Sequence, residues 1–153
     1  MKTRNLVLKI SAMVLCALTI VPLFLNFITL KNGDNKFSYT FANTAGSGDA
    51  LLVISRILVI TTVVVAFVLL AGLALQFFFR NDILNYVVVG TGVFIMVTST
   101  LSFVSTLLYC LSISEMGKFV WFPSIGCYIL LACAIIAPVL LYITTMQPTK
   151  KRK

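Results

Sequence analysis

The residues of this sequence best placed to do chemistry are hydroxyl side chains on one face of a predicted helix. The stretch 87–113 contains no charged residue. At about 100° per residue, one narrow arc of this helix carries a set of hydroxyl groups. The set is Thr91, Thr98, Ser102, Ser105 and Tyr109. Because a polar face within lipid turns toward other helices, we expect it to pack against a neighbouring helix or to line a solute pathway.

The groups that most enzymes depend on are scarce in this chain. It has no histidine, which is the commonest general base and the commonest metal ligand. Its four acidic residues all fall in predicted loops or at the ends of apolar stretches: Asp34, Asp49, Asp82 and Glu115. Transport coupled to a carboxylate within the membrane is therefore not expected. We predict no catalytic residue, no cofactor and no metal site.

The four cysteines leave one alternative open. They are Cys16, Cys110, Cys127 and Cys133, and none forms a C-x-x-C motif. Cys110 and Cys127 flank the segment 114–122 and can meet if their helices pack there. The simpler interpretation is that all four are buried free thiols, which behave as small apolar residues.

The composition predicts an all-α integral membrane protein. Hydrophobic residues make up 60% of the 153 residues and charged residues 10%, whereas soluble domains have about 45–50% and about 25%. A helix needs about 20 apolar residues to cross a bilayer. Four stretches reach this length, at about 10–30, 54–79, 87–113 and 124–146. We predict one membrane domain, a four-helix transmembrane bundle over 1–153.

The distribution of basic residues predicts the orientation of this bundle. With both termini inside, the inner side carries eight basic residues: Lys2, Arg4, Lys9, Arg80, Lys150, Lys151, Arg152 and Lys153. The outer side carries four, counting Arg56 as interfacial: Lys31, Lys36, Arg56 and Lys118. The positive-inside rule therefore favours N-in/C-in, with a cytoplasmic turn at 80–86 and a tail at 147–153.

The basic residues also bear on partners. Since they flank the apolar stretches, topology explains them and nucleic-acid binding is not expected. The tail residues Lys150, Lys151, Arg152 and Lys153 lie beside a predicted span, where a basic cluster attracts anionic lipid.

The predicted outer loops, 31–50 and 114–122, contain a strand signal. Asn32-Gly33-Asp34 favours a turn, and residues 37–41 then alternate aromatic and hydroxyl side chains. Residues 28–30 can pair with them as a short β-hairpin. Ser47 or Asp49 can cap the next helix. A candidate partner surface comprises Phe37, Tyr39, Phe41, Arg56 and Trp121. Arg56 is interfacial on one interpretation and an intramembrane functional charge on the other.

Two functions follow as hypotheses. The first is a non-catalytic four-span protein that associates with a membrane-protein partner or with itself, as an accessory subunit, assembly factor or immunity-type factor. The alternative is an oligomeric channel or permease for a small solute, lined by the hydroxyl face of 87–113. The bacterial cytoplasmic membrane is the favoured location, with the endoplasmic reticulum or plasma membrane expected for a eukaryotic host.

Overall fold

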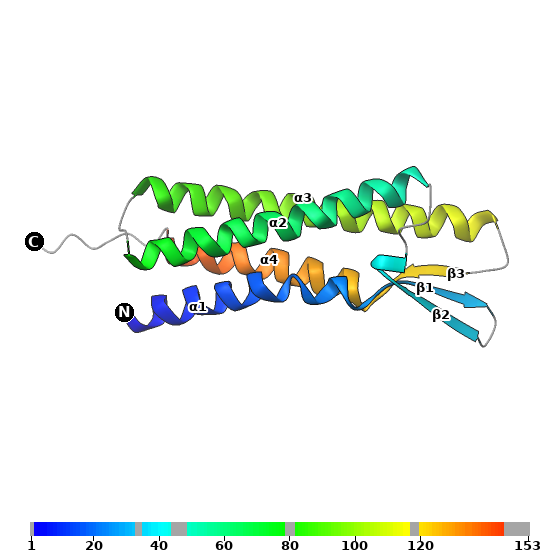
Figure 1. Ribbon diagram of the computed structural model, residues 1–153, viewed down its shortest axis with the longest axis horizontal. Helices are drawn as coiled ribbons and strands as arrows, with labels where there is room; N and C mark the ends of the chain where they lie inside the picture. The colour runs from blue at the N-terminus through cyan, green and yellow to red at the C-terminus, as the bar shows by residue number, and fades with distance from the viewer. Residues whose placement is uncertain (1, 33–34, 44–48, 79–81, 117–119, 146–153) are drawn as a thin grey trace, which may run out of the picture.

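The computed structural model describes residues 2–32, 35–43, 49–78, 82–116 and 120–145. Within them the chain forms four helices, one short 3-10 turn and three strands. In chain order these are α1 (Lys2–Leu18), η1 (Val21–Leu23), β1 (Asn26–Asn32), β2 (Asn35–Thr40), α2 (Ala50–Phe78), α3 (Asp82–Met116), β3 (Val120–Pro123) and α4 (Ile125–Thr145). Figure 1 shows an elongated bundle in which α1 begins and α4 ends at one end, while the strands lie at the other.

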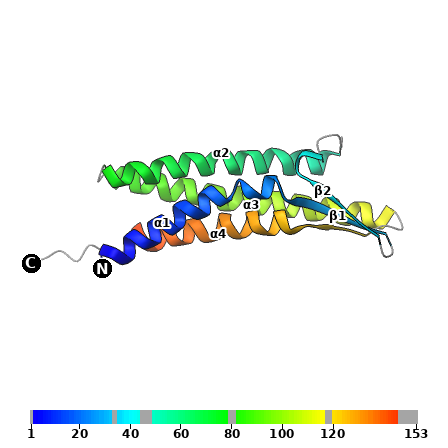
Figure 2. The same cartoon turned by 60° about the horizontal axis from the view of Figure 1, so that its bottom comes forward.

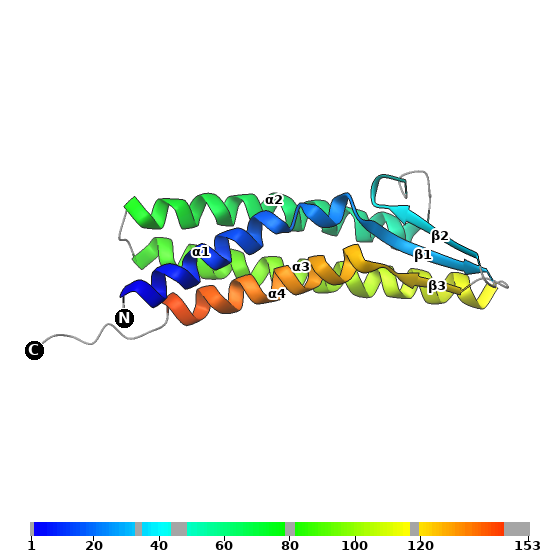
Figure 3. The same cartoon turned by 90° about the horizontal axis from the view of Figure 1, so that it is seen from below.

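The prediction of four helices long and apolar enough to cross a membrane is confirmed. The qualifying segments are Asn5–Leu23, Ala50–Phe78, Asp82–Ser114 and Ile125–Thr144. The helices pack in chain order, α1 with α2, α2 with α3 and α3 with α4, and α1 also packs along α4 to close the bundle. Figures 2 and 3 show the α1–α4 contact from two directions.

The first helix differs from its predicted range of 10–30. It begins earlier, at Lys2, and ends at Leu18, so that residues 26–32 form a strand instead. Two local features end it. Thr19 turns its hydroxyl back onto the carbonyl oxygen of Cys16 at 2.6 Å, and Pro22 has no N–H to continue the helical ladder. Pro22 therefore lies just beyond the end of α1, in η1, and not within a continuous helix.

The other three helices lie close to their predicted ranges. Those ranges were 54–79, 87–113 and 124–146, and the helices run from 50 to 78, 82 to 116 and 125 to 145. Asp49 caps α2, because its Oδ1 accepts the N–H of Leu51 at 2.9 Å. The other predicted cap, Ser47, lies outside the described residues. So do Arg80, Lys118 and the tail residues Lys150, Lys151, Arg152 and Lys153.

The predicted hairpin is present and belongs to a larger sheet. Ile28, Thr29 and Leu30 of β1 pair with Tyr39, Ser38 and Phe37 of β2. The strand order is β2-β1-β3, all antiparallel, with Leu30 of β1 also facing Trp121 of β3. The sequence does not predict β3, because four residues of the second loop carry too little pattern to indicate a strand.

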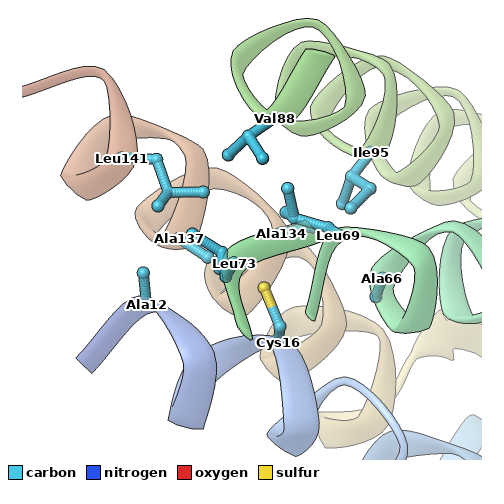
Figure 4. Close-up of a cluster of buried hydrophobic side chains, with 10 residues drawn as sticks. All are labelled: Ala12, Cys16, Ala66, Leu69, Leu73, Val88, Ile95, Ala134, Ala137 and Leu141. Atoms are coloured by element: carbon cyan, nitrogen blue, oxygen red, sulfur yellow. The ribbon is translucent and has the colours of Figure 1, made fainter. Parts of the chain in front are cut away.

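Two clusters of buried side chains hold these elements together. Figure 4 shows the first, which draws on all four helices. Alanines in α1 and α4 (Ala12, Ala134, Ala137) let these two helices approach closely. The second cluster lies under the sheet and joins β1 to α2, α3 and α4. Its buried members are Phe27, Ile28, Leu52, Val59, Tyr109, Cys110, Cys127 and Leu130.

The helices differ in length, and the difference decides where the sheet lies. With 29 and 35 residues, α2 and α3 are about 44 Å and about 53 Å long at about 1.5 Å per residue. With 21 residues, α4 measures about 32 Å. The sheet packs beside the extra length of α3, at the end of the bundle opposite the start of α1 (Figure 1).

Candidate functional site

The hydroxyl face of α3 meets a matching set of hydroxyl groups on α2. Oγ of Ser55 lies 2.6 Å from Oγ1 of Thr106 and 3.2 Å from Oγ of Ser102. Ser102 also donates to the carbonyl oxygen of Ser55 at 3.2 Å. All three side chains are almost completely buried. We call these interhelical hydrogen bonds, together with the contacts of Thr62 with Thr98 and of Ser105 with Leu51, the hydroxyl seam.

The seam continues toward both ends of the bundle. On one side, Oγ1 of Thr62 lies 2.9 Å from Oγ1 of Thr98. On the other, Ser105 donates to the carbonyl oxygen of Leu51 at 2.7 Å. Three of the predicted face residues, Thr98, Ser102 and Ser105, therefore contact α2 directly. Their hydroxyls are hydrogen-bonded to α2 or to backbone carbonyls of their own helix.

The other two residues of the predicted face lie elsewhere. Thr91 is half-buried and donates to the carbonyl oxygen of Val87 in its own helix at 2.8 Å. Tyr109 is buried beneath the sheet, where its ring meets that of Trp121 edge-on at 6.4 Å between centroids. The five predicted face residues therefore do not form one continuous contact: three of them pack against α2, and Thr91 and Tyr109 have other surroundings.

Sequence alone does not single out the α2 half of the seam. Ser55 and Thr62 stand in a run of apolar residues, where isolated small hydroxyls are common. Their spacing of seven residues places both on one side of a helix. That spacing is the signal by which they could have been found.

The predicted partner surface divides into two groups at the sheet end. Tyr39 and Trp121 lie on strands flanking β1, and their rings stack at 5.9 Å with an interplanar angle of 19°. Phe37, on the same side of the sheet, remains 53% exposed. The aromatic contacts of Tyr39 and Trp121 thus attach this side of the sheet to α3, and Phe37 is left at its margin.

Arg56 and Phe41 form the second group. The Arg56 guanidinium carbon lies 5.8 Å from the centre of the Phe41 ring, within the range of a cation–π contact. Phe41 in turn packs edge-on against the buried Phe27 at 5.4 Å. Arg56 is half-buried in the second turn of α2. Its contact is therefore with the segment that follows β2, at the sheet end of the bundle.

A series of side-chain hydrogen bonds joins three helices at the end of the bundle opposite the sheet. Lys9 of α1 donates to Oε1 of Gln76 at 2.9 Å, and Nε2 of Gln76 donates to Oδ1 of Asn85 at 3.0 Å. Gln76 is buried. The sequence analysis did not predict this series of hydrogen bonds. The available signal was a single glutamine within the apolar run of α2 and a single lysine about two turns inside α1.

The cysteines are free thiols, and all four are buried. Cys127 donates to the carbonyl oxygen of Phe27 at 3.3 Å, which ties the start of α4 to β1. Among the described residues, no group of three or more histidine, cysteine or acidic side chains could hold a metal ion.

The hydroxyl groups of the seam are used in packing α2 against α3. The seam hydroxyls bond to one another and to backbone carbonyls, and none of them pairs with a base that could activate it. Comparison of the chain with protein-family models, with curated proteins and with solved structures finds no match.

Proposed function

We propose that the protein is a non-catalytic four-span membrane protein that acts by associating with another membrane protein. It would serve as an accessory subunit, an assembly factor or an immunity-type factor. The observation that carries this proposal is the sheet at one end of the bundle. It is fixed to α3 by the edge-on contact of Trp121 with Tyr109, and it leaves residues 35–39 of β2 exposed.

Helix lengths support a placement in the bilayer. A hydrocarbon core of about 30 Å matches α4 and the first apolar segment. The surplus of α2 and α3 then projects on the sheet side together with the strands. Arg56, in the second turn of α2, falls in this surplus, which supports the interfacial interpretation of its charge.

The basic residues support an orientation in which the sheet is outside. Both termini then lie in the cytoplasm, where the tail residues Lys150, Lys151, Arg152 and Lys153 meet anionic lipid. A bacterial cytoplasmic membrane fits this proposal, and in a eukaryotic host the endoplasmic reticulum or plasma membrane would take its place.

The alternative, an oligomeric channel lined by the α3 hydroxyls, has less support. Thr98, Ser102 and Ser105 already bond to α2 or to backbone carbonyls. Lining a pathway would require α2 to separate from them. Solute flux into liposomes above that of empty liposomes, abolished by Ser102→Leu, would favour the channel over our proposal.

The proposal is tested by purifying the tagged protein in mild detergent and weighing the intact complex by native mass spectrometry. We expect a second protein in stoichiometric amount. Phe37→Ser should weaken its retention, because Phe37 is an exposed aromatic of the sheet. Phe78→Ser is the matched control, since Phe78 is 82% exposed at the opposite end of the bundle. Purification as a bare monomer or homo-oligomer would refute the proposal.

A further inference from the structure

Among the residues that the structure describes, strand β2 forms one edge of the sheet. β3, at the other edge, is held against α3, since the N–H of Trp121 donates to Oγ of Ser114 at 2.9 Å. Among the described residues, β2 pairs with β1 on one side and with no strand on the other. Its residues 35–39 are all exposed, and Figures 1 and 3 show β2 at one edge of the sheet, with β1 between it and β3.

An edge of this kind offers unused backbone groups. In an antiparallel sheet, alternate residues of an edge strand direct their N–H and C=O groups away from the paired strand. Such a row is a template on which an extended segment of another chain can add as a further strand. With six residues, β2 is long enough to pair with a segment of similar length.

We propose that β2 binds an extended acidic segment of a partner protein, which adds to the sheet as a fourth strand. This inference rests on the proposed function and specifies the chemistry of the partner. Two observations carry it: the uncovered edge and the charge of the sheet face beside it.

Like charges face each other on the outer side of the hairpin. Lys31 and Lys36 are directly opposite in the β1–β2 register, and both are exposed. Directly opposed like charges destabilise a strand pair. A carboxylate on an added strand, directly opposite Lys36, would lie within reach of its ammonium group. The added strand would thus supply an attraction that offsets the repulsion between Lys31 and Lys36.

The side chains of β2 alternate between the two sides of the sheet, and this alternation predicts the rest of the partner segment. Directly opposite residues of an antiparallel pair lie on the same side of the sheet. The segment therefore carries acidic or hydroxyl residues opposite Lys36 and Ser38. Opposite Phe37 and Tyr39 it carries β-branched or aromatic residues. A second copy of this chain fits less well, because it would bring the same two lysines to the same face.

The first step of the test places a photo-crosslinker at the edge. The full-length chain is expressed in its host with p-benzoylphenylalanine in place of Phe37, a substitution of one aromatic for another. A matched variant carries it in place of Phe94, which is similarly exposed on α3. After irradiation, the crosslinked peptide is identified by mass spectrometry. We expect the Phe37 variant alone to capture an acidic segment with alternating apolar residues from a different protein.

The second step measures binding of a synthetic peptide with the captured sequence to the purified protein in detergent. Lys36→Glu should weaken binding at least about fivefold, because it opposes like charges across the new strand pair. Lys36→Arg should keep the affinity. Lys36→Glu also places a carboxylate opposite Lys31, which favours the hairpin, so a loss of binding cannot be assigned to unfolding of β2.

Each other outcome overturns the inference. Capture of a second copy, of lipid or of a segment without acidic residues would do so, as would an affinity unchanged by Lys36→Glu. A stoichiometric partner that crosslinks elsewhere would refute the inference and leave the proposed function standing. Absence of a partner from the native complex would refute both.

Discussion

The hydroxyl seam gives a prediction whose size can be worked out from its contacts. Ser55→Ala removes the hydroxyl that lies 2.6 Å from Thr106 and 3.2 Å from Ser102. The neighbours keep other bonds: Thr106 still donates to the carbonyl oxygen of Ser102 at 2.9 Å, and Ser102 to that of Ser55 at 3.2 Å. The substitution therefore removes one interhelical hydrogen bond without leaving a buried group unsatisfied.

The expected cost is that of one such bond between helices in a membrane, about 0.6 kcal/mol and at most about 1.7 kcal/mol. Thr100→Ala is the control, because the exposed Thr100 hydroxyl bonds only to the carbonyl oxygen of Met96 in its own helix. It should change the free energy of unfolding by less than about 0.5 kcal/mol, as a surface substitution does. The double variant Ser55→Ala/Thr106→Ala should show coupling, since the two hydroxyls share a bond.

The assay is reversible unfolding of the purified protein by sodium dodecyl sulfate in mixed micelles. The chain has one tryptophan, and Trp121 stacks on Tyr39, so its fluorescence reports whether the sheet remains packed. Ser55→Leu should cost more than Ser55→Ala, about 1–3 kcal/mol, because the site has no exposed surface into which a larger side chain could turn. If Ser55→Ala and Thr100→Ala had equal effects, the seam would not stabilise the α2–α3 contact and our reasoning would be wrong.

Three further predictions concern the ends of the helices. Gly126→Ala should destabilise the fold by about 1–3 kcal/mol, because a Cβ there would lie 2.8 Å from the backbone oxygen of Asn26, the first residue of β1. Gly90→Ala is the control, since a Cβ there would have nothing within 4 Å, and equal unfolding midpoints for the two variants would contradict the geometry. Gln76→Leu should lower the free energy of unfolding by about 1–3 kcal/mol, because it removes the hydrogen bonds of Gln76 to Lys9 and Asn85. Adding Lys9→Met should recover part of that loss in the same assay, and no recovery would mean that Lys9 and Gln76 are not coupled. Asp49→Ala should lower the free energy of unfolding by about 0.5–2 kcal/mol and should speed amide hydrogen exchange only in the first turn of α2. Unchanged exchange there would show that Asp49 does not cap the helix.

Several features could be predicted from the sequence because they depend on neighbouring residues. Apolar runs of sufficient length fix the number of helices that can cross a membrane, and the alternation after Asn32 indicates the β1–β2 hairpin. Asp49 caps α2 because its carboxylate reaches an N–H two residues ahead. Each of these rests on contacts within a few residues of the chain, which local pattern encodes directly.

Contacts between distant segments were decided only by the tertiary structure. β3 joins a strand about 90 positions earlier in the chain, and Lys9 meets a glutamine 67 positions away. Periodicity predicts that α3 has a hydroxyl face, but it cannot say that Ser55 and Thr62 of α2 fill it. That pairing depends on how far each helix is rotated about its axis and shifted along it. Packing of all four helices and the sheet sets those two quantities together, and no single stretch of sequence carries them.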